Sequence, residues 1–201
     1  MSVRGIVLAG GAASRFGGKP KGLERVGGER ILDRVLLAVQ QATGAPPVLV
    51  ANAADARGWR PGLEVAHDVR AGCGSLGGIY TAVAAGPGPV LVVAWDMPFV
   101  TADLLHALVK GSDGYDAFLP ESGGRRGLEP LCAVYGPACE VAIRGRLDQE
   151  DYRAIGFHQD VRVGTLPIEQ VAAFGDPETL FFNVNTAEDL ARAEELWRRP
   201  G

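Results

Sequence analysis

Cysteine and histidine are scarce in this chain of 201 residues, with three of each. They occur at positions 73, 132 and 139 for cysteine and at positions 67, 106 and 158 for histidine. The cysteines are odd in number and form no C-x-x-C pair, and the histidines show no ligand spacing. This scatter argues against a structural zinc site and against a disulfide framework. We expect the cysteines to be small apolar side chains in a core, and the histidines to have no catalytic role.

Long apolar runs and an excess of positive charge are also lacking. The run PVLVVAW at 89–95 is the size of a strand and far short of the roughly 18 residues of a membrane span. The formal net charge of −4 excludes the broad basic face of a general nucleic-acid binder. The N-terminal stretch MSVRGIVLAGG is too short for the apolar region of a signal peptide. We therefore expect a cytoplasmic protein that binds neither nucleic acid nor a membrane.

Lysine is scarce too, because only Lys19, Lys21 and Lys110 occur and arginine fills the other Lys+Arg positions. Two of these lysines lie in one stretch, LAGGAASRFGGKPKG at 8–22, together with five glycines. Glycine lets backbone N–H groups approach an anion, and lysine supplies a compact charge suited to phosphate. The stretch is not a Walker A loop, since proline follows Lys19. It predicts a phosphate-binding loop, with a solvated surface loop as the alternative.

Short β-branched runs alternate with helical periods along the chain. Strands are predicted at 3–9, 46–51, 63–66, 89–94, 115–120, 128–135 and 161–167. Helices are predicted at 31–42, 76–86, 101–111, 137–147 and 185–199. This alternation favours a mostly parallel, twisted sheet with helices on both faces. Because no linker, repeat or low-complexity tract interrupts it, we predict an α/β fold in a single three-layer domain over 1–201.

Polar residues follow the early predicted strands, namely Asn52, His67–Asp68 and Asp96. Ligands of open α/β sheets bind outside the carboxyl ends of the strands, so we expect these residues to converge with the stretch 8–22. Asp96 comes directly after an apolar strand in AWDMP, a setting that suits Mg²⁺ bound by one or two carboxylates and substrate phosphates. A role as a turn or cap residue is the alternative for Asp96 and for Asp68.

A second glycine motif, GCGSLG at 72–77, matches the G-x-G-x-x-G fingerprint of dinucleotide-binding proteins. Asp96 lies roughly where that fingerprint places an acid for the ribose. The fingerprint glycines should follow their strand directly, however, and here residues 67–71 intervene. We therefore expect a loop and a tight helix start close to a ligand, and keep a dinucleotide-dependent oxidoreductase as the disfavoured alternative.

The end of the chain carries two asparagines in NVNT, at 183–186, after an LFF run that predicts a strand over 180–182. Asn183 is a candidate site residue. Asn185 and Thr186 have a sufficient structural role as the cap of the last helix. Glu129 lies where a second substrate could bind, and a solvated loop is the alternative there.

Taken in order, these motifs resemble those of the molybdenum cofactor guanylyltransferase family, within the nucleotidyltransferases. The first stretch matches the nucleotidyltransferase signature L-A-G-G-x-[x]-S-R-[FM]-G-x-x-K. The later motifs that narrow the resemblance are GSLGGIYTAV, WDMPFV, EPLCAVY and FNVNT. The resemblance runs from Ile6 to about Leu190, and implies a Rossmann-like nucleotidyltransferase fold.

This resemblance implies roles for particular residues. The nucleotide-binding residues that it implies are Leu8, Ala9, Gly10, Gly11, Lys21, Asn52, Asp68 and Asp96. Lys21 and Asp96 would also be catalytic, with Arg15 as supporting charge, and Asp96 would ligate Mg²⁺. The residues that it implies for the acceptor substrate are Gly77, Gly78, Glu129, Asn183 and Asn185.

The implied reaction is a Mg²⁺-dependent transfer of GMP from GTP to the terminal phosphate of molybdenum-loaded molybdopterin, which releases pyrophosphate. Residues 1–100 would form the nucleotide-binding half and residues 101–201 the acceptor half. We also expect transient contact with molybdoenzymes or with proteins that deliver the pterin. The alternatives are a related cytidylyltransferase or sugar-phosphate nucleotidyltransferase, and a non-catalytic nucleotide-binding module.

Overall fold

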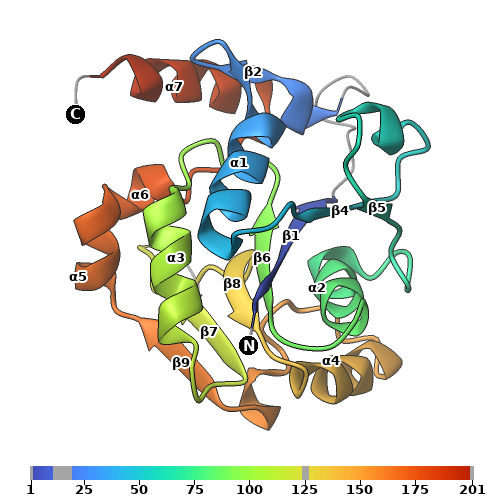
Figure 1. Ribbon diagram of the computed structural model, residues 1–201. Coiled ribbons are helices and arrows are strands. Elements are labelled where there is room, and N and C mark those ends of the chain that lie inside the picture. The colour runs from blue at the N-terminus through green and yellow to red at the C-terminus, as the bar shows by residue number, and fades with distance from the viewer. Residues whose placement is uncertain (1, 11–19, 124–126, 200–201) are drawn as a thin grey trace.

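Seven strands form one sheet in the computed structural model, which describes residues 2–10, 20–123 and 127–199 (Figure 1). The strands of this sheet are β1 (Arg4–Ala9), β4 (Val48–Ala51), β5 (Val65–Ala66), β6 (Val90–Ala94), β7 (Ala117–Pro120), β8 (Cys132–Tyr135) and β9 (Val163–Leu166). They lie in the order β5-β4-β1-β6-β8-β7-β9. All neighbours are parallel except β8, which runs antiparallel to both β6 and β7. The predicted α/β fold with a mostly parallel sheet is confirmed.

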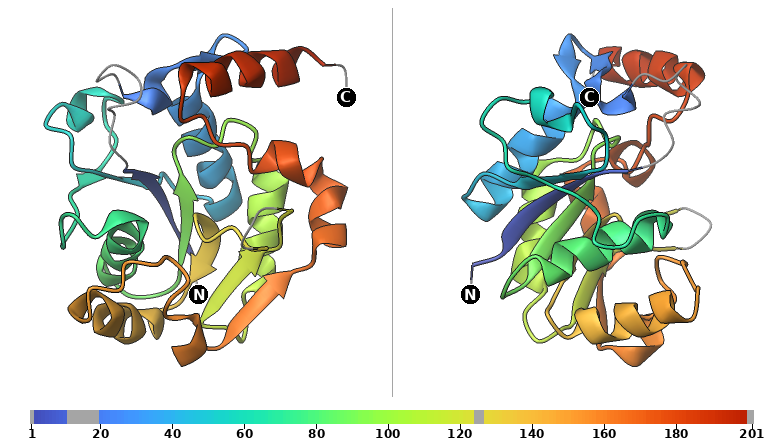
Figure 2. Two further views of the ribbon diagram at one scale, coloured as in Figure 1. Left: turned by 180° about the vertical axis from the view of Figure 1, so that it is seen from behind. Right: turned by 90° about the vertical axis from the view of Figure 1, so that its right-hand side faces the viewer.

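Helices cover both faces of this sheet, as the two further views also show (Figure 2). α1 (Ile31–Thr43) and α3 (Ala102–Gly111) pack together on one face, and α2 (Gly74–Ala84) and α4 (Cys139–Asp148) on the other. The remaining helical segments are η2 (Lys21–Leu23), η3 (Ala56–Gly58), η4 (His158–Asp160), α5 (Ile168–Val171), η5 (Ala172–Phe174), α6 (Pro177–Leu180) and α7 (Ala187–Arg198). The three predicted layers are therefore present.

The central strand β6, with the sequence VLVVA, shows why the sheet needs cover on both sides. All five of its residues are buried. Leu91 and Val93 belong to the core beneath α1 and α3, while Val90 and Val92 belong to the core beneath α2 and α4. Because successive side chains of a strand point to opposite faces, a strand that is apolar throughout can only be satisfied between two helical layers.

The predicted cysteine environment is also confirmed, since Cys73, Cys132 and Cys139 are free thiols with buried side chains. Burial raises the pKa of Cys132 and, first among several causes, raises the pKa of Cys139 to about 12. Both thiols are therefore neutral packing groups at neutral pH. In the part of the chain that the structure describes, no helix is both long and apolar enough to cross a membrane.

Two local predictions need correction or addition. The prediction of a strand over 180–182 is wrong, because Leu180 ends the short helix α6, which has Asp176 as its N-cap and begins at Pro177. The Asp176 carboxylate accepts a hydrogen bond from the Thr179 N–H at 3.0 Å, so the Asp-Pro pair starts a helix where the apolar run suggested a strand. A hairpin of β2 (Arg25–Val26) and β3 (Glu29–Arg30) was not foreseen, although its two-residue Gly-Gly loop is a hairpin signal.

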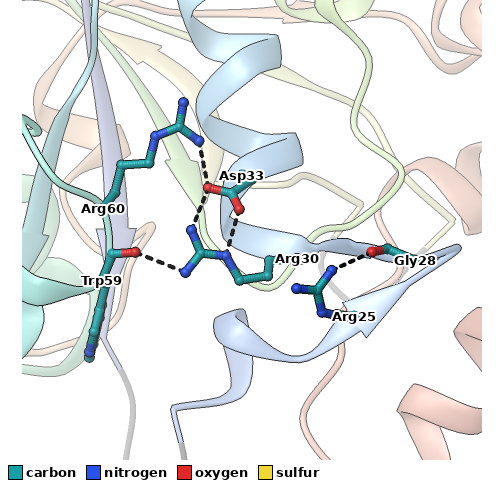
Figure 3. A network of polar contacts seen from close by, with 6 residues as sticks. All are labelled: Arg25, Gly28, Arg30, Asp33, Trp59 and Arg60. Carbon is teal, nitrogen blue, oxygen red and sulfur yellow. Dashed lines mark hydrogen bonds and ion pairs between the residues drawn. The ribbon is translucent and has the colours of Figure 1, made fainter.

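An arginine pair fastens the start of α1 to the loop that follows β4 (Figure 3). Arg30 donates to both oxygens of the Asp33 carboxylate, at 2.6 and 3.0 Å, and to the Trp59 carbonyl at 2.9 Å. Arg60 donates to the same carboxylate at 2.6 Å. Partial burial acts to raise the pKa of Asp33, but the hydrogen bonds from Arg30 and Arg60 outweigh it and lower that pKa. Asp33 therefore links the hairpin, α1 and the 56–60 segment through charge.

The substitution Asp33→Asn should lower the free energy of unfolding by about 1–3 kcal/mol at pH 7, because it removes charge-assisted hydrogen bonds. The folded-state pKa lies below the unfolded one, so this contribution is present above the unfolded pKa of about 3.9 and is lost as the pH falls through the folded pKa. Urea unfolding at pH 7 and at successively lower pH should show the difference from wild type shrinking below about pH 4.

Asp103→Asn is the matched control, because Asp103 also lies in the first turn of a long helix and is exposed. It has the same interaction with a helix N-terminus, worth about 0.3–1 kcal/mol, but no arginine among the described residues forms an ion pair with its carboxylate. Equal losses of stability in the two variants would contradict a specific role for Arg30 and Arg60.

Candidate active site

The carboxyl ends of six parallel strands meet at one edge of the sheet, and the predicted nucleotide-binding residues that the structure describes lie there. Ala9 ends β1 and is followed by Gly10, which is exposed, whereas Leu8 and Ala9 have buried side chains. Leu8 and Ala9 can therefore offer a ligand only backbone atoms. Gly11 and Arg15 lie outside the described residues, so their predicted roles stay predictions.

Lys21 and Asp96 form an ion pair at this edge. Lys21 opens the turn η2, and Asp96 lies two residues beyond the end of β6. Their side chains are only 13% and 9% exposed, so the pair is held away from solvent. The Lys21 ammonium also donates to the amide oxygen of Asn185 at 2.6 Å. Three segments of the chain thus converge on one ammonium group.

The backbone around Asp96 is fixed on both sides. The Trp95 N–H donates to the Leu8 carbonyl at 3.1 Å, and the Asp96 carbonyl accepts from the Val184 N–H at 2.9 Å. The Trp95 ring stacks on Trp59 with centroids 5.0 Å apart. These contacts tie Asp96 to β1 and to the segment before α7, so its carboxylate has a defined position.

Gly22, the residue after Lys21, has a reason to be glycine. A Cβ atom at this position would lie 2.6 Å from Cδ2 of the buried Trp95 ring. The bare backbone of Gly22 therefore lies against the indole, which brings the neighbouring Lys21 to Asp96. A side chain there would force the turn away from the site.

Asn52 and Asp68 form a second polar pair, at the ends of β4 and β5. The Asn52 amide donates to the Asp68 carboxylate at 2.6 Å, and the Asp68 N–H donates to the Asn52 amide oxygen at 2.9 Å. The neighbouring His67 ring nitrogen Nδ1 lies 2.8 Å from the Ala51 carbonyl. These two residues, both predicted to contact nucleotide, are therefore brought together at the same sheet edge, with Asn52 exposed and Asp68 partly buried.

The residues predicted for an acceptor substrate have diverse surroundings. Gly77 and Gly78 are buried in α2, where a Cβ at Gly78 would lie 3.1 Å from Leu8 Cδ1. Their absence of side chains serves the close packing of α2. The amide of Asn183 donates to the Phe181 carbonyl at 2.8 Å, and Glu129 lies just before β8 with its N–H donating to the Pro120 carbonyl at 3.2 Å. Their acceptor roles stay predictions.

The role of Asn185 differs from the helix cap that sequence reasoning favoured. Thr186 is the N-cap of α7, with its hydroxyl accepting from the Asp189 N–H at 3.1 Å. The side chain of Asn185 is left to bind Lys21. No local sequence signal reveals this contact, because the two residues are 164 positions apart.

Residues 5–163 match the family described as the MobA-like NTP transferase domain. A protein named "Probable molybdenum cofactor guanylyltransferase" from Pelotomaculum thermopropionicum is 37% identical, over 98% of this chain and 94% of its own. The "Molybdenum cofactor guanylyltransferase" of Desulfosudis oleivorans is 32% identical, over 96% of this chain and 95% of its own.

A solved structure of molybdopterin-guanine dinucleotide biosynthesis protein A from Archaeoglobus fulgidus has a TM-score of 0.80 and 29% identity, with 96% of this chain and 98% of that chain covered. A 2-C-methyl-D-erythritol 4-phosphate cytidylyltransferase from Thermus thermophilus shares the fold, with a TM-score of 0.66 at 18% identity over 99% of this chain and 100% of that chain. The curated relatives cover nearly the whole sequence, whereas the family model ends at residue 163, before Asn185. The chain therefore belongs to the molybdenum cofactor guanylyltransferase family, within the MobA-like NTP transferases.

Proposed function

We propose that this protein transfers GMP from GTP to the terminal phosphate of molybdenum-loaded molybdopterin and releases pyrophosphate. The observation that carries the proposal is the Lys21–Asp96 ion pair at the carboxyl edge of the sheet, in a chain that matches relatives named as guanylyltransferases over nearly its full length. An ammonium suits a triphosphate, and a carboxylate suits the divalent cation that accompanies it.

The reaction asks for positioning and charge neutralisation more than for covalent catalysis. An oxygen of the terminal pterin phosphate attacks the α-phosphorus of GTP, a new P–O bond forms, and the bond to the β-phosphate oxygen breaks. The attacking phosphate is already anionic at neutral pH, so no side-chain base is needed. Lys21 would stabilise the negative charge that grows on the phosphate oxygens. The same role predicted for the glycine N–H groups of 8–22 falls mostly on residues outside the described part of the chain.

Mg²⁺ fits the residues that are present. Asp96 offers hard oxygen ligands, and its carboxylate already faces the positive charge of Lys21. Among the described residues there is no group of three or more His, Cys, Asp or Glu side chains that could hold a metal ion without a substrate. That matches Mg²⁺, which nucleotide enzymes bind through one or two carboxylates together with phosphates. When bound on Asp96, Mg²⁺ would neutralise part of the triphosphate charge.

The Asn52–Asp68 pair supports the nucleotide side of the proposal. The Asn52 amide donates to the Asp68 carboxylate and accepts from the Asp68 backbone N–H, and both residues lie at the sheet edge that also carries the Lys21–Asp96 pair. The carboxylate of Asp68 can accept hydrogen bonds from hydroxyl or amine groups of a nucleoside, and Asn52 fixes its orientation.

The substitution Lys21→Ala should lower kcat/KM for pyrophosphate release by about 10²–10³-fold, by analogy with other fixed donors that face developing charge. Lys110→Ala is the matched control, because Lys110 lies exposed on α3. Thermal unfolding of both variants separates lost chemistry from lost folding, since Lys21→Ala leaves the Asp96 carboxylate unpaired. Turnover of Lys21→Ala close to wild type would contradict the assignment.

Asp96→Asn should remove most of the gain in GTP affinity that Mg²⁺ provides, because the neutral amide attracts a divalent cation far less than the carboxylate does. Calorimetric titration of GTP with and without Mg²⁺ measures this gain. Asp68→Asn is the matched comparison: it should weaken GTP binding under both conditions and keep the gain from Mg²⁺. If Asp96→Asn kept the full gain, the metal would have to be held elsewhere.

Base selectivity is tested by the same titration with GTP, CTP and UTP in the presence of Mg²⁺. We expect a clear binding isotherm for GTP and none for the two pyrimidine nucleotides at the same concentrations. Tight binding of CTP without binding of GTP would replace the proposal by a cytidylyltransferase. Binding of GTP without pyrophosphate release in the presence of molybdopterin would indicate a non-catalytic nucleotide-binding module.

A further inference from the structure

Asn185 gives the Lys21 ammonium a second acceptor, which is an uncharged amide, whereas the first acceptor, the Asp96 carboxylate, is negatively charged. The Lys21 Nζ to Asn185 Oδ1 distance is 2.6 Å, and the Lys21 side chain is largely buried. A hydrogen bond from a charged donor is stronger than one between neutral groups. Asn185 therefore holds the lysine without cancelling its charge.

The position of Asn185 is set by bonds that do not involve Lys21. The Val184 N–H donates to the Asp96 carbonyl at 2.9 Å, which docks this segment beside the backbone of Asp96. The N–H groups of Asn185 and Thr186 both donate to the Asp189 carboxylate at 2.9 Å, as part of the capping box of α7. The amide oxygen is thus a fixed point to which the flexible lysine side chain is tied.

The choice of an amide at position 185 has an electrostatic consequence. Two carboxylates around one ammonium would leave a net negative charge, which would repel a triphosphate. With one carboxylate and one amide the group is neutral overall, and the ammonium charge would no longer be offset if Asp96 bound a divalent cation. Of the two acceptors that Lys21 has among the described residues, Asn185 would then be the one that still holds it.

We propose that Asn185 is a positioning residue for Lys21, which it anchors at the site while Asp96 exchanges the ammonium for a divalent cation. This inference rests on the proposed function for the roles of Lys21 and Asp96 in turnover, but the anchoring itself is a property of the ligand-free chain. It assigns Asn185 to the phosphate-binding lysine rather than to the acceptor substrate or to the cap of α7.

The scarcity of lysine makes the anchoring measurable. The chain has three lysines, so brief acylation with acetic anhydride followed by peptide mass spectrometry gives a separate rate for each of them. Loss of the Asn185 acceptor frees the Lys21 side chain to leave its largely buried position, which speeds acylation. Lys110, exposed on α3, is the internal control in every sample.

Asn185→Leu, which keeps the size of the side chain and removes the acceptor, should raise the acylation rate of Lys21 about tenfold without changing that of Lys110. Asn185→Asp restores an acceptor and should return the Lys21 rate to the wild-type value or below. If the leucine variant does not fold, Asn185→Ala removes the same acceptor and should give the same increase in the Lys21 rate. Thr186→Ala is the control for a merely structural effect: it removes the cap of α7, so it should lower the melting temperature and leave the Lys21 rate within about twofold.

Unchanged acylation of Lys21 in both Asn185→Leu and Asn185→Ala would overturn the proposal. The proposal would also be overturned if these variants bound Mn²⁺, as a probe of the divalent cation, more weakly while the acylation rate of Lys21 stayed the same. Asn185 would then be a ligand of the metal. Protection of wild-type Lys21 by GTP with Mg²⁺ tests the proposed function separately. If Asn185→Leu exposes Lys21 while GTP gives no protection, the anchoring stands and the phosphate role of Lys21 fails.

Discussion

The contact between the Lys21 ammonium and the Asp96 carboxylate is the constraint on which the rest of the site depends. It joins residues 75 positions apart, and the hydrogen bond to Asn185 adds a third segment 164 positions from Lys21. A mostly buried charge pair is costly to desolvate, so it persists only where its surroundings fix it. Here the pair is held in place by the backbone hydrogen bonds of Trp95 and Asp96, and by the packing of Gly22 on the indole ring of Trp95.

The sequence allowed much of the fold to be predicted, because its signals are local. The apolar run of β6, the left-handed Gly44 after α1 and the Thr101 cap of α3 each determine one element from neighbouring residues. The strand predicted from the LFF run at 180–182 is wrong because that prediction also used only local composition. The composition of this run favours a strand, and the preceding Asp-Pro start of α6 outweighs it.

The site was predictable in its members more than in its contacts. Loop composition pointed to the lysines of 8–22 and strand ends to Asp68 and Asp96, which topology carries to one edge, whereas the choice of Lys21 came from the family resemblance. The Lys21–Asn185 bond and the Trp59–Trp95 stack are not predictable in this way. They depend on how α7 and the 56–60 segment pack against the sheet. The residue spacing within one motif does not indicate such contacts between distant segments.

Strand β8 is the one reversal in the sheet, and it has a consequence for a reaction between two phosphates. Because β8 runs antiparallel, its beginning lies at the edge where the parallel strands end, and the Ala94 N–H donates to the Leu131 carbonyl there at 2.8 Å. Glu129, predicted for the acceptor, is brought to the same edge as Asp96 by this reversal. A fully parallel connection would begin its strand at the opposite edge, far from Asp96. The mixed sheet thus lets residues from the second half of the chain lie at the same edge as Asp96, where we propose that the nucleotide binds.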